Sequence, residues 1–192
     1  MAPAYLTHRS TQSHGYYSVT ASRFAQMKRE HPELLTPSRF YNGTNSFEED
    51  AEVNRIILAF PTDFSQSTVA TATRWCKDYH PFVWSLYSGA PINTADSATL
   101  RRAAFERMTA SFYVAISAVN AGSHFVLVSF ALGGRSFDTF QLYHPDTIIE
   151  LLIPTAEYEN RPTELGLSFY IEDPSLYESA TDYYNELNSR HA

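Results

Sequence analysis

The sequence predicts an α+β fold in which N-terminal helices pack on a small, mainly antiparallel sheet and a C-terminal helix ends the chain. Two observations predict it. Residues 46–108 carry apolar side chains at helical spacing, whereas residues 112–130 hold two runs of strand-forming residues around a short polar loop. Helices followed by antiparallel strands are typical of the α+β class.

Length and composition favour one domain over residues 1–192, with residues 1–12 as a flexible N-terminal segment. A chain of 192 residues is long enough to bury a core, and its 44% apolar content is ordinary for a globular protein. The sequence contains no repeat, low-complexity segment or long Pro/Gly linker that would mark a second domain.

The first 45 residues predict a short edge strand and one helix. Residues 16–19 form a β-prone run. Thr20 or Ser22 can cap a helix that ends at about Glu30, because Pro32 lacks the N–H that a helix interior requires.

The next helix has the strongest start signal. Ser46 followed three residues later by Glu49 matches a capping box, and adjacent acids suit the positive end of the helix dipole. Pro61 ends this helix. Its core face at helical spacing consists of Val53, Ile56, Ile57 and Phe60.

The remaining elements follow from periodicity and from Pro or Gly punctuation. Residues 66–79 and 97–108 are predicted helices, with a loop or short helix over residues 82–95 between them. Residues 112–119 and 124–130 are predicted strands around a 120–123 hairpin loop. Later come strands at 148–153 and 167–171, a short helix from Pro154 to Asn160, and a last helix from Pro174 to Asn188 capped by Asp173.

The single cysteine, Cys76, excludes an internal disulfide and any multi-cysteine zinc site. We interpret it as a half-buried helix thiol. The N-terminus has no signal-peptide pattern, and no apolar run approaches the roughly 20 residues that span a bilayer. These features predict a cytoplasmic protein without a membrane partner.

Charge is distributed unevenly along the chain. Residues 1–136 hold 12 Lys/Arg and 10 Asp/Glu, whereas residues 137–192 hold 2 Lys/Arg and 11 Asp/Glu. An acidic surface repels phosphate backbones, so we expect no direct nucleic-acid binding and a partner protein with a basic groove. The plainer alternative is a solvated face that keeps the protein soluble.

Two clusters in the N-terminal half could carry chemistry. His14, beside Gly15, could present a ring nitrogen to a substrate or simply mark a turn. Glu48, Glu49 and Asp50 could supply a general base or hold a divalent ion, but neighbouring helix positions diverge by about 100°. Helix capping also accounts for these acids. No metal site is assigned.

Two further stretches lie in the C-terminal half. Gly133 and Gly134 after a strand could admit an anion that Arg135 binds in bidentate fashion, although a strand-end turn explains them equally. Residues 143–146 and 153–158 could line a cleft or decorate a turn. The sequence contains no nucleophile elbow, zinc-helix, phosphate-loop or dinucleotide motif, so no cofactor is expected.

Several short motifs in a shared order resemble an uncharacterised family with a domain of unknown function, carried on bacterial phages, plasmids and integrative elements. The resemblance covers about residues 7–180, although Tyr16 and residues 46–47 depart from the family pattern. It implies a mobile-element gene expressed in the cytoplasm of a bacterial host and supplies no activity. The motifs are Ser13-His14-Gly15, Ser22-Arg23, Phe47-Glu48-Glu49-Asp50, Leu58-Ala59-Phe60-Pro61, Phe130-Ala131-Leu132-Gly133-Gly134, Ile153-Pro154-Thr155-Ala156-Glu157-Tyr158 and Glu172-Asp173-Pro174.

Three functions remain open at this stage, and a non-enzymatic one is favoured. The leading hypothesis is an accessory protein that inhibits a host defence or nucleic-acid-processing protein by occlusion. Its binding residues would be Glu172, Asp173, Glu178 and Asp182, with Arg135 as a separate candidate. The alternatives are a small metal-assisted hydrolase or nucleotide-modifying enzyme that uses His14 with the 48–50 acids, and a self-assembling structural phage protein.

Overall fold

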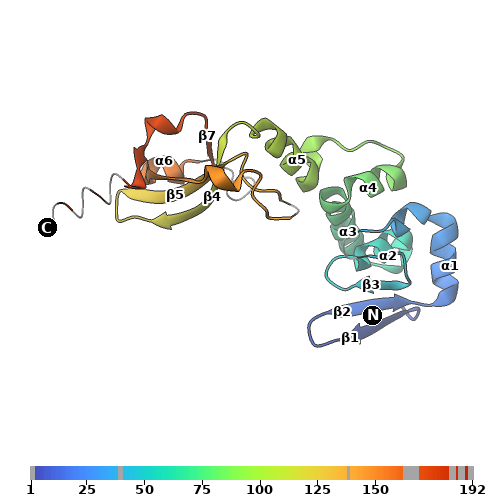
Figure 1. Ribbon diagram of the computed structural model, residues 1–192. Helices are drawn as coiled ribbons and strands as arrows, with labels where there is room; N and C mark the ends of the chain where they lie inside the picture. The colour runs from blue at the N-terminus through green and yellow to red at the C-terminus, as the bar shows by residue number, and fades with distance from the viewer. Residues whose placement is uncertain are drawn as a thin grey trace. The chain divides into compact units, whose positions relative to one another are not determined.

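The computed structural model describes residues 3–38, 41–137, 139–161, 169–181, 185 and 189. Figure 1 traces their helices and strands. The chain's contacts group into two compact units, Met1–Arg101 (the N-terminal unit) and Arg102–Ala192 (the C-terminal unit). Each unit has its own cluster of buried apolar side chains. The mixed α+β class is confirmed.

A three-stranded antiparallel sheet opens the N-terminal unit. Its strands β1 (Leu6–Ser10), β2 (Gly15–Val19) and β3 (Ser46–Glu48) lie in the order β1-β2-β3. The predicted edge strand at 16–19 is therefore the central strand, because β1 forms within the segment that was predicted to be flexible. Figure 1 shows this sheet beside α1 and α2.

Four helices complete the N-terminal unit: α1 (Ala21–Glu30), α2 (Val53–Ala59), α3 (Gln66–Tyr79) and α4 (Pro81–Ser88). The predicted bounds of α1 and α3 are confirmed. The Ser65 hydroxyl caps α3 by accepting from the Thr68 N–H at 3.2 Å. Pro81 begins α4 at the N1 position, where its missing N–H costs nothing.

The predicted capping box at Ser46 and Glu49 is wrong. Ser46 begins β3, and α2 starts at Val53. The Glu48 carboxylate instead accepts the N–H groups of Asp50 and Ala51, at 3.0 and 2.7 Å, in the turn between strand and helix. Pairing of β3 with β2 decides the outcome, because it places Phe47 in the core at 0% exposure.

The C-terminal unit is organised around a five-stranded antiparallel sheet. Helix α5 (Ala98–Met108) begins just before the boundary between the units and is followed by the strongly predicted hairpin of β4 (Tyr113–Asn120) and β5 (Phe125–Leu132). The strand order is β7-β4-β5-β6-β8. The remaining elements are β6 (Ile149–Pro154), α6 (Thr155–Glu159), β7 (Tyr170–Ile171) and β8 (Glu178–Ser179).

The predicted C-terminal helix does not begin at Pro174. Residues 174–176 form one 3₁₀ turn, capped by the Asp173 carboxylate as predicted, and β8 follows. Helical backbone starts only at Ala180. Antiparallel pairing of β8 with β6 explains the difference, because Glu178 and Ser179 continue the sheet at its edge.

Candidate functional site

A buried ion pair lies at the centre of the N-terminal unit. Glu52 immediately precedes α2, Arg55 lies in its first turn, and both residues are 0% exposed. The Glu52 carboxylate contacts Arg55 Nε and accepts from the Ser38 hydroxyl at 2.8 Å. Burying two charges is expensive, so the pair must be well compensated or serve a purpose.

Arg55 ties the preceding loop to α2. Its Nη1 donates to the carbonyl oxygens of Leu34 and Thr36, at 3.0 and 2.7 Å, and its guanidinium lies 5.0 Å from the ring centre of Tyr41. Among the described atoms, Nη2 has no hydrogen-bond partner. Arg55 therefore ties Leu34, Thr36 and Tyr41 to α2 through two charge-assisted hydrogen bonds and one cation–π contact.

Cys76 of α3 and His80, the residue that follows this helix, lie close to the pair. His80 Nε2 lies 3.7 Å from Glu52 Oε1, which by itself favours the imidazolium. Arg55 already neutralises that carboxylate, however, so burial dominates and lowers the pKa of His80, and the positive charge of Arg55 lowers it further. Burial raises the pKa of Cys76 to about 11, so its thiol is a poor nucleophile at neutral pH.

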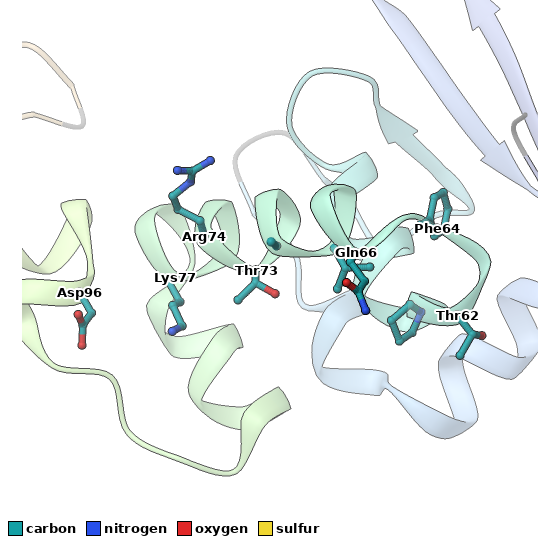
Figure 2. Close-up of a pocket in the computed structure, with 10 residues that line it drawn as sticks. Thr62, Phe64, Gln66, Thr73, Arg74, Lys77 and Asp96 are labelled. Atoms are coloured by element: carbon teal, nitrogen blue, oxygen red, sulfur yellow. The ribbon is translucent and has the colours of Figure 1, made fainter.

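A groove of about 640 Å³ runs along α3 (Figure 2). Gln66, Thr73 and Lys77 recur at helical spacing along it, and Phe64 and Val69 supply apolar surface. Figure 2 shows Thr73 and Lys77 on one side of α3 and Arg74 on the other, with Asp96 beyond Lys77. The groove could accept an apolar group from a partner, and Lys77 is held 5.2 Å from the Trp84 ring centre.

In the predicted cluster of His14 with the 48–50 acids, the histidine that contacts an acid is His8 and not His14. Glu49 Oε2 lies 2.6 Å from Nε2 of His8, an exposed β1 residue that sequence reasoning missed. The Glu49 carboxylate also covers Gly15, where a Cβ would come within 1.9 Å of it. The backbone of His14 forms the β1–β2 turn with Thr11. The described residues contain no group of three His, Cys, Asp or Glu that could hold a metal ion.

The candidate binding residues of the C-terminal unit separate into two places. Arg135 follows Gly134 in the turn after β5 and lines a cavity. Glu172, Asp173 and Glu178 are exposed in and beside the segment between β7 and β8. Asp182 lies outside the described residues.

Sequence reasoning missed the Glu52–Arg55–His80 cluster. Its acid and arginine stand three residues apart, an ordinary spacing for a solvated helix pair. The apolar residues around them are the signal that could have found this cluster. Val53, Ile56 and Ile57 leave almost no exposed face on so short a helix, so a charged residue there must be buried.

The sequence model of a domain of unknown function (DUF7007) matches residues 6–110, which is more than half of the chain. That stretch contains the whole three-stranded sheet, helices α1–α5, the buried ion pair and the α3 groove. No curated protein and no solved structure matches the chain significantly. Within the described residues, no helix combines the length and the apolar character that crossing a membrane would require.

Proposed function

This chain belongs to the family of a domain of unknown function (DUF7007), and we propose that it is a non-enzymatic protein of a phage or mobile element that binds and inhibits a host protein. The mobile-element setting is what the family resemblance of the sequence motifs implies. The mode of inhibition we propose is occlusion, in which an acidic face of this protein covers a basic groove of a host defence or nucleic-acid-processing protein.

One observation carries the proposal: an exposed leucine stands among exposed acids. Leu176 is 78% exposed, more than any other large apolar side chain in the described part of the molecule. Glu172, Asp173 and Glu178 are exposed within four residues of it. We call these four residues the Leu176 surface. Apolar anchors within a polar rim are the usual pattern of protein-binding hot spots.

The Leu176 surface is held in shape before any partner arrives. The Asp173 carboxylate accepts from the backbone N–H and the hydroxyl of Ser175, at 2.9 and 2.6 Å, which lowers the pKa of Asp173. The Tyr177 hydroxyl donates to Glu157 of α6 at 2.6 Å. A fixed loop loses less conformational entropy on binding, so these contacts favour affinity.

The charge of the C-terminal unit favours a basic partner. Residues 102–192 hold 5 Lys/Arg and 12 Asp/Glu. Such a surface accelerates association with a positive groove and repels nucleic acid, and its effect weakens as salt screens it.

Affinity capture from lysate of the bacterial host, with and without nuclease, tests the proposal. Tagged wild-type protein is expected to retain a nuclease-resistant host protein, identified by mass spectrometry. The variant Glu172→Lys/Glu178→Lys is expected to weaken binding to that purified protein at least about tenfold, mainly through the association rate. Asp173 is left intact because it caps the 3₁₀ turn.

The matched control is Asp146→Lys/Glu159→Lys, which changes the charge of the same unit equally at two other exposed acids. If this control weakens binding as much as the test variant, net charge and not the Leu176 surface is responsible. If neither variant alters binding or its salt dependence, occlusion by the acidic face is wrong.

The enzymatic and self-assembly alternatives stay predictions with cheap tests. A metal-dependent hydrolytic or nucleotide-modifying activity that disappears in Glu49→Ala would favour the first, and light scattering that shows large assemblies would favour the second. For the enzymatic alternative, Glu48 accepts two backbone N–H groups and Glu49 pairs with His8, so these contacts already account for both acids.

A further inference from the structure

A second feature of the C-terminal unit lies apart from the Leu176 surface. A cavity of about 210 Å³ lies between α5, the start of β4 and the residues Gly133, Arg135, Ser136, Phe137 and Phe140. Phe105, Val114, Ala115 and Phe137 form its apolar walls, and Arg135 is the cation among its lining residues. Sites for drug-sized ligands occupy roughly 300–1,000 Å³, so this cavity suits a single ring with one polar substituent.

Arg135 is an exposed residue at the edge of this cavity, where an anion bound in the cavity can reach it. Its Nη2 donates to the carbonyl oxygen of Ile116 at 3.0 Å, which anchors one nitrogen of the guanidinium. The residue has no other hydrogen bond or ion pair within the described part of the chain. A guanidinium with free donors in a planar fork matches a carboxylate better than any other side chain does.

Glu106 also lines the cavity. Its Oε1 accepts the Phe137 N–H at 2.8 Å, which ties Phe137 to α5. Phe137 in turn packs edge-on against Phe105, with ring centres 6.4 Å apart. The walls are therefore fixed without using Arg135.

Phe140 holds an unusual conformation at this cavity. Its φ of 58° lies in the left-handed region that residues with a Cβ rarely adopt, and its side chain is 66% exposed. A backbone turn holds this conformation, because the Phe140 N–H donates to the Ser136 carbonyl oxygen and the Ser136 N–H donates to the Gln141 carbonyl oxygen, both at 2.9 Å, and it leaves the phenylalanine ring exposed. Strain of this kind concentrates at ligand sites, where it holds a side chain ready for its partner.

We propose that this cavity binds a small aromatic carboxylic acid. The ring would lie among Phe105, Phe137 and Phe140, where aromatic faces and edges pack well, and the carboxylate would accept hydrogen bonds from Arg135. Gly134 needs no ligand to explain it, because a Cβ there would meet the Val114 side chain at 2.8 Å.

Fluorine NMR with 4-fluorobenzoate as the probe tests this site. The wild-type protein is expected to broaden the probe signal with a Kd on the order of 1 mM, the range for so few ligand atoms. The isosteric amide 4-fluorobenzamide, which lacks the charge, is expected to bind at least about tenfold more weakly because Arg135 gains no ion pair with it.

Two variants assign the contacts. Arg135→Gln is expected to reduce 4-fluorobenzoate affinity to that of the amide, whereas Arg107→Gln, an exposed arginine of α5 outside this cavity, leaves it unchanged. Phe140→Asn is expected to weaken the binding of both probes while the melting temperature stays the same or rises, because asparagine tolerates the left-handed conformation.

Equal binding of acid and amide, or an Arg135→Gln variant that binds the acid as the wild type does, would overturn the proposal. So would the absence of binding at millimolar protein and probe. The Glu172→Lys/Glu178→Lys variant should retain the site in full, so failure here and failure of the proposed host-protein binding are separate results.

Discussion

The two units differ in net charge and in whether charged side chains are buried. The N-terminal unit holds 9 Lys/Arg and 9 Asp/Glu over residues 1–101, so it is neutral overall, yet it buries Glu52 and Arg55 completely. The C-terminal unit accounts for the whole net charge of −7. Among its described residues, Thr109 is the one polar side chain in the interior.

Buried and exposed charges have different physical consequences. Buried charge is costly and directional, so in the N-terminal unit it fixes which segments meet. Surface charge contributes little to stability and acts on partners at a distance, and the recognition role that we propose for the C-terminal unit rests on this. The family match covers mainly the N-terminal unit, whereas the Leu176 surface lies outside it.

Breaking the buried pair should have the largest effect. Glu52→Gln and Arg55→Met are each expected to lower the free energy of unfolding by about 3–5 kcal/mol, because each leaves a buried partner uncompensated. The double variant Glu52→Leu/Arg55→Met should cost less than the sum of the two. Both tryptophans, Trp75 and Trp84, lie in the N-terminal unit, so urea unfolding followed by tryptophan fluorescence measures it directly.

The control for the buried pair is the exposed pair Arg29–Glu30. Arg29→Met should change the stability by less than about 1 kcal/mol, the usual range for a surface ion pair. Should Arg55→Met prove no worse than Arg29→Met, the buried pair does not hold the N-terminal unit together.

Gly134→Ala tests the C-terminal unit separately. Its φ of 73° and the nearby Val114 side chain should make an added Cβ cost about 2–4 kcal/mol. Gly122→Ala, with a positive φ but open space around it, should cost about 1 kcal/mol. Far-ultraviolet circular dichroism should show the loss while the tryptophan transition keeps its midpoint. A shift of both transitions together would mean that the two units unfold as one.

The smallest expected effect is a pH dependence confined to the N-terminal unit. The ordinary pKa of histidine is 6.5, and the folded state lowers the pKa of His80. As the pH falls below about 6.5, His80 becomes protonated in the unfolded chain but stays neutral in the folded protein. Protonation therefore stabilises the unfolded state, and the free energy of unfolding falls. The slope is at most about 1.4 kcal/mol per pH unit, and it ends below the folded pKa.

His80→Gln should flatten this pH dependence in tryptophan-detected unfolding between about pH 7.5 and 5.5. A wild-type stability that is constant over this window, or a His80→Gln variant with the same slope as the wild type, would show that another group is responsible.

Local signals in the sequence were enough to predict the elements whose ends are marked by caps and prolines. The end of α3 follows from Pro81, and the β4–β5 hairpin follows from two β-branched and aromatic runs around a polar loop. The α+β class and the acidic C-terminal third also follow from composition and order along the chain.

The other elements and the buried clusters depend on contacts between segments that are distant in the sequence, and no local sequence pattern predicts such contacts. Ser46 is in a strand instead of a helix cap because β3 pairs with β2, and Glu178 and Ser179 join the sheet because they pair with β6. In the same way, the burial of α2 makes Glu52 and Arg55 a buried pair, and the residues of the turn after β5 form a cavity with α5 that Arg135 lines. Contacts between residues far apart in the chain depend on the whole fold, so only the tertiary structure could supply them.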